Sequence, residues 1–154
     1  MSELKSTLRA DLTTAMKAKD PLRVNTLRML LAAVQNTEVA GAEARELSDS
    51  EVQAVLAKEA KKRSEAAVIY EQNNRPELAA NERAEEEIIA SYLPTQLSDA
   101  EVAEIADTAI AEVAEQTGAR PHMKQMGQVM KVATAMAQGR VDGSRLSAAV
   151  KARL

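Results

Sequence analysis

The sequence of 154 residues contains no cysteine, which excludes disulfides, thiolate metal sites and cysteine nucleophiles. It also contains no Phe, no Trp and only two Tyr, so any core must consist of aliphatic side chains. Because strands favour aromatic and β-branched residues, this composition predicts an all-α protein. Hydrophobic residues make up 45% and charged residues 28%, which is the balance of a folded chain.

Long hydrophobic runs are missing as well, and none approaches the roughly 20 residues that cross a bilayer. The first residues, Met-Ser-Glu-Leu-Lys, lack the charged-then-apolar profile of a signal peptide. On these grounds we expect a cytoplasmic location.

Residues that carry chemistry are equally scarce. The single histidine, His122, follows Pro121 and has no partner at a recognisable spacing. The consecutive acids at 85–87 point in different directions around a helix, which is typical of a solvated face. The five glycines form no phosphate-binding loop. We therefore predict no catalytic residue, no metal site and no cofactor.

Hydrophobic periodicity and helix start and stop signals predict seven helices. They span about residues 2–19, 21–40, 48–70, 77–93, 98–116, 123–137 and 142–154. Pro94 stands between the fourth and the fifth, and four helices with short connections can form a bundle. We therefore expect a four-helix N-terminal subdomain over 1–94 and a small three-helix C-terminal subdomain over 95–154.

Local signals within these helices are specific. The first helix carries hydrophobic residues four apart from Leu4 to Met16, which predicts a buried stripe. Ser48 and Ser98 each precede a glutamate by three residues, which predicts a capping box at two helix starts. In the basic run 61–63, glutamates lie four residues away, so ion pairs on a helix explain the run better than a nucleic-acid patch.

Charge is distributed unevenly along the chain. Residues 119–154 carry seven Lys or Arg and one Asp, whereas the first 118 residues carry 13 basic and 22 acidic residues. This asymmetry predicts that the C-terminal part meets an anionic partner. A solvated basic tail explains it equally well, and the sequence leaves both interpretations open.

Gly127 lies inside a predicted helix, where glycine is less stable than alanine by about 0.5–1 kcal/mol. The helix has an apolar face from Met126 to Met136, and Lys124 and Lys131 fall together on another face, beside the glycine. Either a neighbouring helix packs closely over Gly127, or a nucleic-acid backbone approaches between the two lysines. Free N–H groups at the start of the last helix add phosphate-binding capacity.

Several segments resemble the YqeY family. The family's C-terminal signature is carried by Lys124, Met126-Gly127, Val129-Met130-Lys131, Gly139-Arg140-Val141-Asp142-Gly143 and Val150-Lys151. Further segments extend the resemblance over nearly the whole chain: 15–20, 27–31, 58–70, 75–78 and 92–98. This family is in turn similar to the C-terminal tail of the B subunit of glutamine-dependent aminoacyl-tRNA amidotransferase, GatB.

The resemblance implies an all-α protein whose C-terminal three helices are GatB-tail-like. In the amidotransferase the tail helps to hold tRNA, while glutamine hydrolysis and ATP-dependent transfer belong to other domains and subunits. We therefore expect a non-catalytic tRNA-binding or amidotransferase-related accessory protein, with tRNA and a protein of tRNA-dependent amidation as partners. The candidate RNA-binding residues are Lys124, Gly127, Lys131, Arg140, Gly143, Arg145 and Lys151.

Two other functions stay open. The acidic N-terminal helices or the methionine-rich face could dock on another protein, as in an interaction module. By family relation alone, the chain could also share a carbon–nitrogen ligase activity with glutamine as amido-N-donor.

Overall fold

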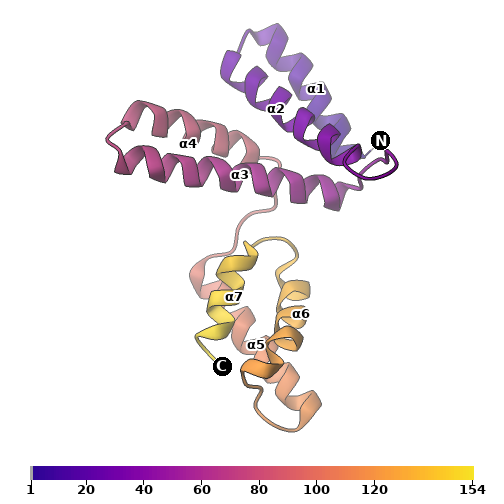
Figure 1. The fold of residues 1–154 in the computed structure, drawn as a ribbon, viewed down its shortest axis with the longest axis vertical. Coiled ribbons are helices and arrows are strands. Elements are labelled where there is room, and N and C mark those ends of the chain that lie inside the picture. Colours follow the sequence, from indigo (N-terminus) through magenta and orange to yellow (C-terminus); the bar gives the residue numbers. More distant parts are fainter. Residues whose placement is uncertain (1) are drawn as a thin grey trace. The chain divides into compact units, whose positions relative to one another are not determined.

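The computed structural model describes residues 2–154, and within this range the chain forms helices and no strand. The predicted all-α fold is thus confirmed (Figure 1). In chain order the elements are α1 (Glu3–Ala18), α2 (Pro21–Glu38), α3 (Asp49–Gln72), α4 (Pro76–Ala90), α5 (Asp99–Thr117), the 3₁₀-helix η1 (Met123–Gln125), α6 (Met126–Ala137) and α7 (Gly143–Lys151).

The chain divides into two compact units, residues 1–93 and residues 94–154. The N-terminal unit contains α1 to α4, and the C-terminal unit contains α5, η1, α6 and α7. Each unit has a hydrophobic core of its own, built from aliphatic side chains.

Both predicted capping boxes are present. The Ser48 hydroxyl accepts a hydrogen bond from the Glu51 N–H at 3.2 Å, and the Glu51 carboxylate accepts one from the Ser48 N–H at 3.4 Å. Ser98 and Glu101 repeat this pattern at the start of α5, with both distances at 3.2 Å. Arg45 also bonds Glu51 and, together with the cap, lowers the pKa of that carboxyl to about 2. The starts of α3 and α5 are therefore encoded locally.

The N-terminal unit consists of two helical hairpins, α1–α2 and α3–α4 (Figure 1). Its core is closed by fully buried leucines and by Ile89 near the end of α4. Towards the turn between α3 and α4 the hairpin has less cover, and Val68, Ile69 and Leu78 are exposed there.

The hydrophobic stripe predicted on α1 is wrong at its last position. Leu8 is fully buried, but Met16 is 50% exposed, and Ala15 faces the core instead. A spacing of four residues exceeds the 3.6 residues of a helical turn, so each step rotates the side chain by about 40° around the helix. Over three steps this drift carries Met16 out of the core.

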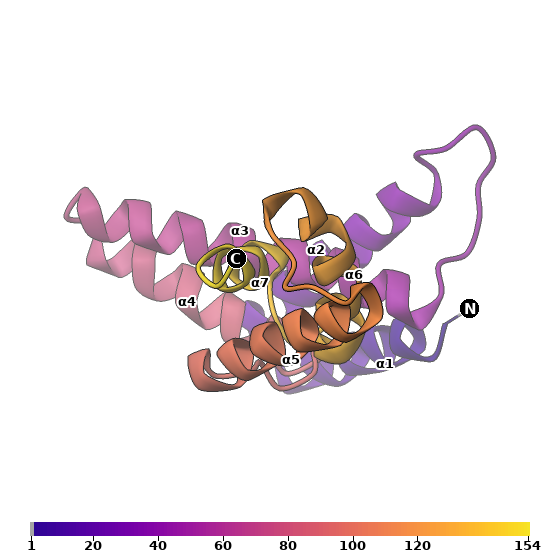
Figure 2. The same ribbon diagram turned by 90° about the horizontal axis from the view of Figure 1, so that it is seen from below.

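Helix α2 ends at Glu38, two residues before the predicted end at residue 40. The Glu38 carboxylate is buried, accepts hydrogen bonds from Lys5 Nζ at 2.6 Å and from the Leu47 N–H at 3.4 Å, and has its pKa lowered mainly by Lys5. It thereby ties α1 to the far end of the connection to α3, which Figure 2 shows as an extended loop. A long-range side-chain contact therefore accompanies the end of this helix.

The basic run on α3 is engaged in ion pairs, as predicted. Arg63 pairs with Glu59 at 2.9 Å along the helix and with Glu85 of α4 at 3.4 Å, and all three side chains are largely buried. Lys62 pairs with Glu59 at 3.1 Å. The run therefore helps to join the two helices of the hairpin.

Tyr92 links the segment after α4 to the first helix. Its hydroxyl donates a hydrogen bond to Asp11 Oδ2 at 2.6 Å. Burial and this carboxylate raise the pKa of Tyr92 to about 12, so the neutral phenol is the form that the folded unit favours.

The C-terminal unit packs α5, α6 and α7 around small side chains, among them Ala106, Ala109 and Ala133. Gly118, with φ +78°, ends α5 in the left-handed conformation, and its N–H bonds the Ala114 carbonyl at 2.9 Å. This confirms the predicted break.

We predict that replacing Tyr92 by Phe lowers the free energy of unfolding by about 1 kcal/mol at neutral pH, because the bond to Asp11 is lost. The raised pKa adds a pH dependence: the stabilisation is complete below the unfolded pKa of about 10 and is lost as pH rises towards 12. Urea unfolding between pH 7 and 11.5 should therefore show a steeper alkaline loss in the wild type than in Tyr92→Phe. Tyr70→Phe is the matched control, and equal slopes for wild type and Tyr92→Phe would contradict the role of Tyr92.

Candidate nucleic-acid interface

All seven residues predicted to bind RNA lie in the C-terminal unit, on its second half. Lys124 lies in η1, Gly127 and Lys131 in α6, Arg140 in the turn before α7, and Gly143, Arg145 and Lys151 in α7. They fall into two groups, according to whether the side chain makes hydrogen bonds or ion pairs within the protein.

The two candidate arginines are bonded within the unit. Arg140 Nε donates to the Thr95 carbonyl at 2.8 Å, and the Arg140 carbonyl accepts from the Leu97 N–H at 2.8 Å. Arg145 donates to the Leu97 carbonyl at 3.2 Å and to Asp99 Oδ1 at 2.7 Å. Together they hold the first residues of the unit against the α6–α7 turn, so their first role is structural.

The other two arginines of this region, which were not candidates, behave in the same way. Arg120 donates to the Arg153 carbonyl at 2.6 Å, and Arg153 in turn pairs with Asp107 of α5 at 2.8 Å. Every arginine between residues 119 and 154 therefore makes bonds inside the unit.

The three lysines of the set form the opposite group. Lys124, Lys131 and Lys151 are exposed, and none makes a hydrogen bond or an ion pair to any residue in the range 2–154. A phosphate that binds them breaks no internal bond of the protein. They are thus the cations of this unit that an anionic partner can reach without structural loss.

Gly127 borders open space. It lies in the first turn of α6, is exposed, and a Cβ added to it would meet nothing within 4 Å. The interpretation that a neighbouring helix packs closely over this glycine is therefore wrong. A bulky partner can approach the backbone here, between Lys124 and Lys131.

The start of α7 is less suited to phosphate than the sequence suggested. The Asp142 carboxylate caps this helix and accepts a hydrogen bond from the Ser144 N–H at 3.0 Å. The expectation of free N–H groups is wrong for Ser144, and the carboxylate repels an anion at this end. Gly143, beside it, borders open space like Gly127.

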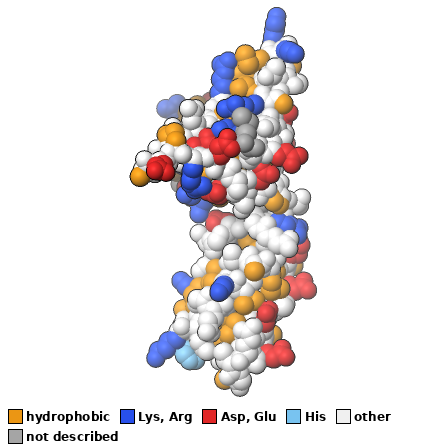
Figure 3. All heavy atoms as spheres, turned by 90° about the vertical axis from the view of Figure 1, so that its right-hand side faces the viewer, with side chains coloured by type: hydrophobic (Ala, Val, Ile, Leu, Met, Phe, Trp, Pro, Cys, Tyr) orange, Lys and Arg blue, Asp and Glu red, His pale blue; other side chains and the backbone are white. Residues whose placement is uncertain are grey.

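Charge in the unit is segregated by helix. Residues 94–118 carry six acids and no cation, while residues 119–154 carry seven cations and one acid, so the formal net charge of the unit is zero. On the face that Figure 3 shows, acidic side chains gather along one edge of this unit and hydrophobic side chains lie beside them. The basic excess of residues 119–154 is therefore local, and α5 supplies an acidic boundary to it.

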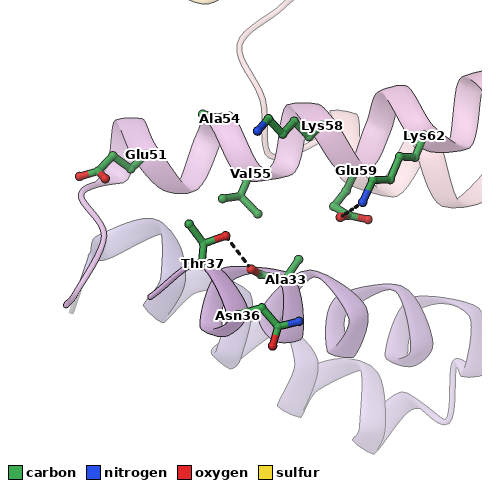
Figure 4. A pocket seen from close by; sticks show the side chains of 9 residues that line it. All are labelled: Ala33, Asn36, Thr37, Glu51, Ala54, Val55, Lys58, Glu59 and Lys62. Carbon is green, nitrogen blue, oxygen red and sulfur yellow. Dashed lines mark hydrogen bonds and ion pairs between the residues drawn. The ribbon is translucent and has the colours of Figure 1, made fainter. Parts of the chain in front are cut away.

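A separate hollow of about 450 Å³ lies in the N-terminal unit, between α2 and α3 (Figure 4). Val55 points into it, and at one end Lys62 pairs with Glu59, which also pairs with Arg63. Sequence reasoning missed this hollow because its two walls lie far apart along the chain. Its carboxylates are engaged with cations, so it presents no ready acid or base.

No group of three or more His, Cys, Asp or Glu side chains suited to a metal ion occurs among residues 2–154. His122 lies in the loop before η1, where its backbone N–H donates to Gln125 Oε1 at 3.1 Å. In the same range, no helix combines the length and the hydrophobicity that crossing a bilayer requires.

Comparisons with known proteins agree with the resemblance seen in the sequence. The family model described as Yqey-like protein matches residues 5–154, which confirms that resemblance. The protein called "Altered inheritance of mitochondria protein 41, mitochondrial" from Meyerozyma guilliermondii is 33% identical over 129 residues, covering 82% of this chain and 67% of the relative. Its namesake from Lachancea thermotolerans is 38% identical over 98 residues, covering 64% and 51%.

A third namesake, from Clavispora lusitaniae, is 36% identical over 103 residues and is matched over 59% of its length. The chain thus spans about half to two thirds of the length of these relatives. All three carry the word mitochondrial in their names. These names contradict the cytoplasmic location that was expected from the sequence.

We predict that Gly127→Ala folds normally and raises the free energy of unfolding by about 0.5 kcal/mol, because the new methyl group meets open space and the unfolded chain loses freedom. Ala135→Gly, at an exposed position of the same helix, is the matched control and should lower it by about 0.5–1 kcal/mol. Urea unfolding followed by circular dichroism measures both. Destabilisation by Gly127→Ala would show that the glycine is covered after all.

Proposed function

The chain belongs to the YqeY family, and we propose that it is a non-catalytic accessory protein that binds transfer RNA through its C-terminal unit. The resemblance of residues 124–154 to the tail of the amidotransferase B subunit supports RNA as the partner. The contacts would be phosphate contacts, which supply most of the affinity of such complexes and carry no sequence information.

The observation that carries this proposal is the division between arginines and lysines. The arginines of the unit are bonded to carbonyls and carboxylates, whereas Lys124, Lys131 and Lys151 are exposed and have no partner among residues 2–154. Ammonium groups held on a folded surface without internal partners serve as point charges for phosphates. Gly127 between two of them leaves room for the RNA backbone.

The acids of α5 restrict how RNA can approach. The six carboxylates of this helix repel phosphates, so phosphates are favoured near the lysines and disfavoured along α5. Both tyrosines lie in the N-terminal unit, so His122 is the one aromatic side chain of residues 94–154, and a run of bases has no series of rings on which to stack. Recognition of RNA shape through phosphates fits this surface better than recognition of a long single strand.

We predict that labelled tRNA binds the chain with an affinity that falls as salt rises, with a log–log slope of about −2 to −3 for three phosphate contacts. The Lys124→Ala, Lys131→Ala double variant should bind about tenfold more weakly and make this slope shallower by about 1.5, because two contacts are lost. Fluorescence anisotropy over a salt series measures both quantities.

The matched control is the Lys17→Ala, Lys58→Ala double variant, which removes the same charge from exposed lysines of the N-terminal unit. It should bind like the wild type. Absence of tRNA binding at low salt, or an equal loss of affinity in both double variants, would contradict the proposal.

One observation favours a second function, docking of another protein. Val68, Ile69 and Leu78 are exposed near the α3–α4 turn, and hydrophobic side chains grouped on a surface often mark protein contacts. A specific protein retained by the tagged chain after nuclease treatment would support this function. Glutamine hydrolysis by the pure chain would instead support the carbon–nitrogen ligase relation.

A further inference from the structure

An open groove of about 650 Å³ lies between α5 and α6 of the C-terminal unit. The groove is open to solvent, and of its lining residues only Val132 is partly buried, so a ligand in it keeps one side exposed. One of its walls includes Lys131, so the groove adjoins the surface proposed to hold RNA phosphates.

The hydrophobic part of the groove is formed by Val132, Ala135 and Met136 of α6. Helical periodicity places Met136 on the same face as Val129, which is fully buried, yet Met136 is 38% exposed. The apolar face from Met126 to Met136 is therefore not covered at this residue, because periodicity does not say how far a neighbouring helix extends. An uncovered thioether beside two small aliphatic side chains is a surface on which a flat ring can lie.

The polar part of the groove has two exposed amide groups. Gln116 and Gln128 line it from opposite helices, and neither side chain makes a hydrogen bond to any residue in the range 2–154. A primary amide offers one acceptor and two donors next to each other, and this is the pattern that pairs with the edge of a nucleobase. The two amides therefore point to a heterocycle rather than to a purely aliphatic ligand.

The charges of the groove suit the rest of a nucleotide. Lys131 and Glu112 both line it and form no ion pair with each other. An ammonium group binds a phosphate, and a carboxylate accepts a hydrogen bond from the 2′-hydroxyl of a ribose. RNA carries both groups on each nucleotide, whereas DNA lacks the hydroxyl.

We propose that this groove holds one unpaired nucleotide of the bound RNA. Its base lies on Met136 and Val132 with its edge towards the two glutamines, its phosphate lies at Lys131 and its 2′-hydroxyl at Glu112. The inference rests on the proposed function and adds to it a site for a nucleotide outside the paired stem. Because no aromatic ring is present, the site takes a single base and not a stacked run.

The test compares three RNA hairpins with the same stem, each closed by a polyethylene glycol linker instead of a nucleotide loop: blunt, with one unpaired 3′ adenosine, and with one unpaired 3′ deoxyadenosine. Binding is measured by anisotropy at constant low salt with the full chain. The adenosine hairpin should bind about tenfold tighter than the blunt one, as two to three added hydrogen bonds allow, and the deoxyadenosine hairpin should bind between them.

Two variants locate the effect. In Ala135→Phe, which fills the groove, and in the Gln116→Ala, Gln128→Ala double variant, the advantage of the unpaired adenosine should disappear while binding of the blunt hairpin remains. Ala111→Phe is the matched control for the first, since Ala111 is exposed on α5 and does not line the groove, and it should keep the advantage. Circular dichroism checks that each variant is folded. If Ala135→Phe does not fold, the Gln116→Ala, Gln128→Ala double variant alone tests the nucleotide site.

The outcomes separate this inference from the function on which it rests. Equal binding of the blunt and the adenosine hairpins by the wild type would overturn the nucleotide site and leave phosphate binding intact. An advantage that persists in the folded double variant would also overturn it. If no hairpin binds at all, both proposals fail together.

Discussion

The hydrogen bonds of the arginines decide which cations of the C-terminal unit stay available, and two of the six carboxylates of α5 take part in them. Arg145 pairs with Asp99 and Arg153 with Asp107, while Arg140 and Arg145 also bind carbonyls at the start of the unit. The planar guanidinium group can satisfy carboxylates and carbonyls at once, which an ammonium group does less well. The arginines therefore join the helices, and the lysines are left at the surface.

The division between bonded arginines and unpaired lysines determines where the proposed interface is positively charged. A region that reads as a basic tail belongs to a neutral unit in which positive and negative charge lie on different helices. An anionic partner meets an attractive surface at Lys124 and Lys131 and a repulsive one along α5. The groove between α5 and α6 lies where these two surfaces meet, so that it carries one cation, one acid and two amides.

The parts of the fold that could be predicted depend on residues close in sequence. The capping boxes of α3 and α5 and the Arg63–Glu59 pair need only a spacing of three or four residues, and all are present. The failures depend on distant residues. Met136 shares a helix face with the buried Val129, but burial requires a neighbour to cover it, and no local pattern reports the reach of another helix.

By itself, the sequence determined the all-α fold, the family and the region in which cations accumulate, because composition, periodicity and motifs are properties of the chain alone. Only the tertiary structure decided which cations are free, that Gly127 is uncovered and that a groove lies beside Lys131. The physical reason is that hydrogen bonds from Arg140 and Arg145 reach carbonyls more than 40 residues away. The packing of the helices determines which side chains form ion pairs and hydrogen bonds, and Lys124, Lys131 and Lys151 form none with residues 2–154.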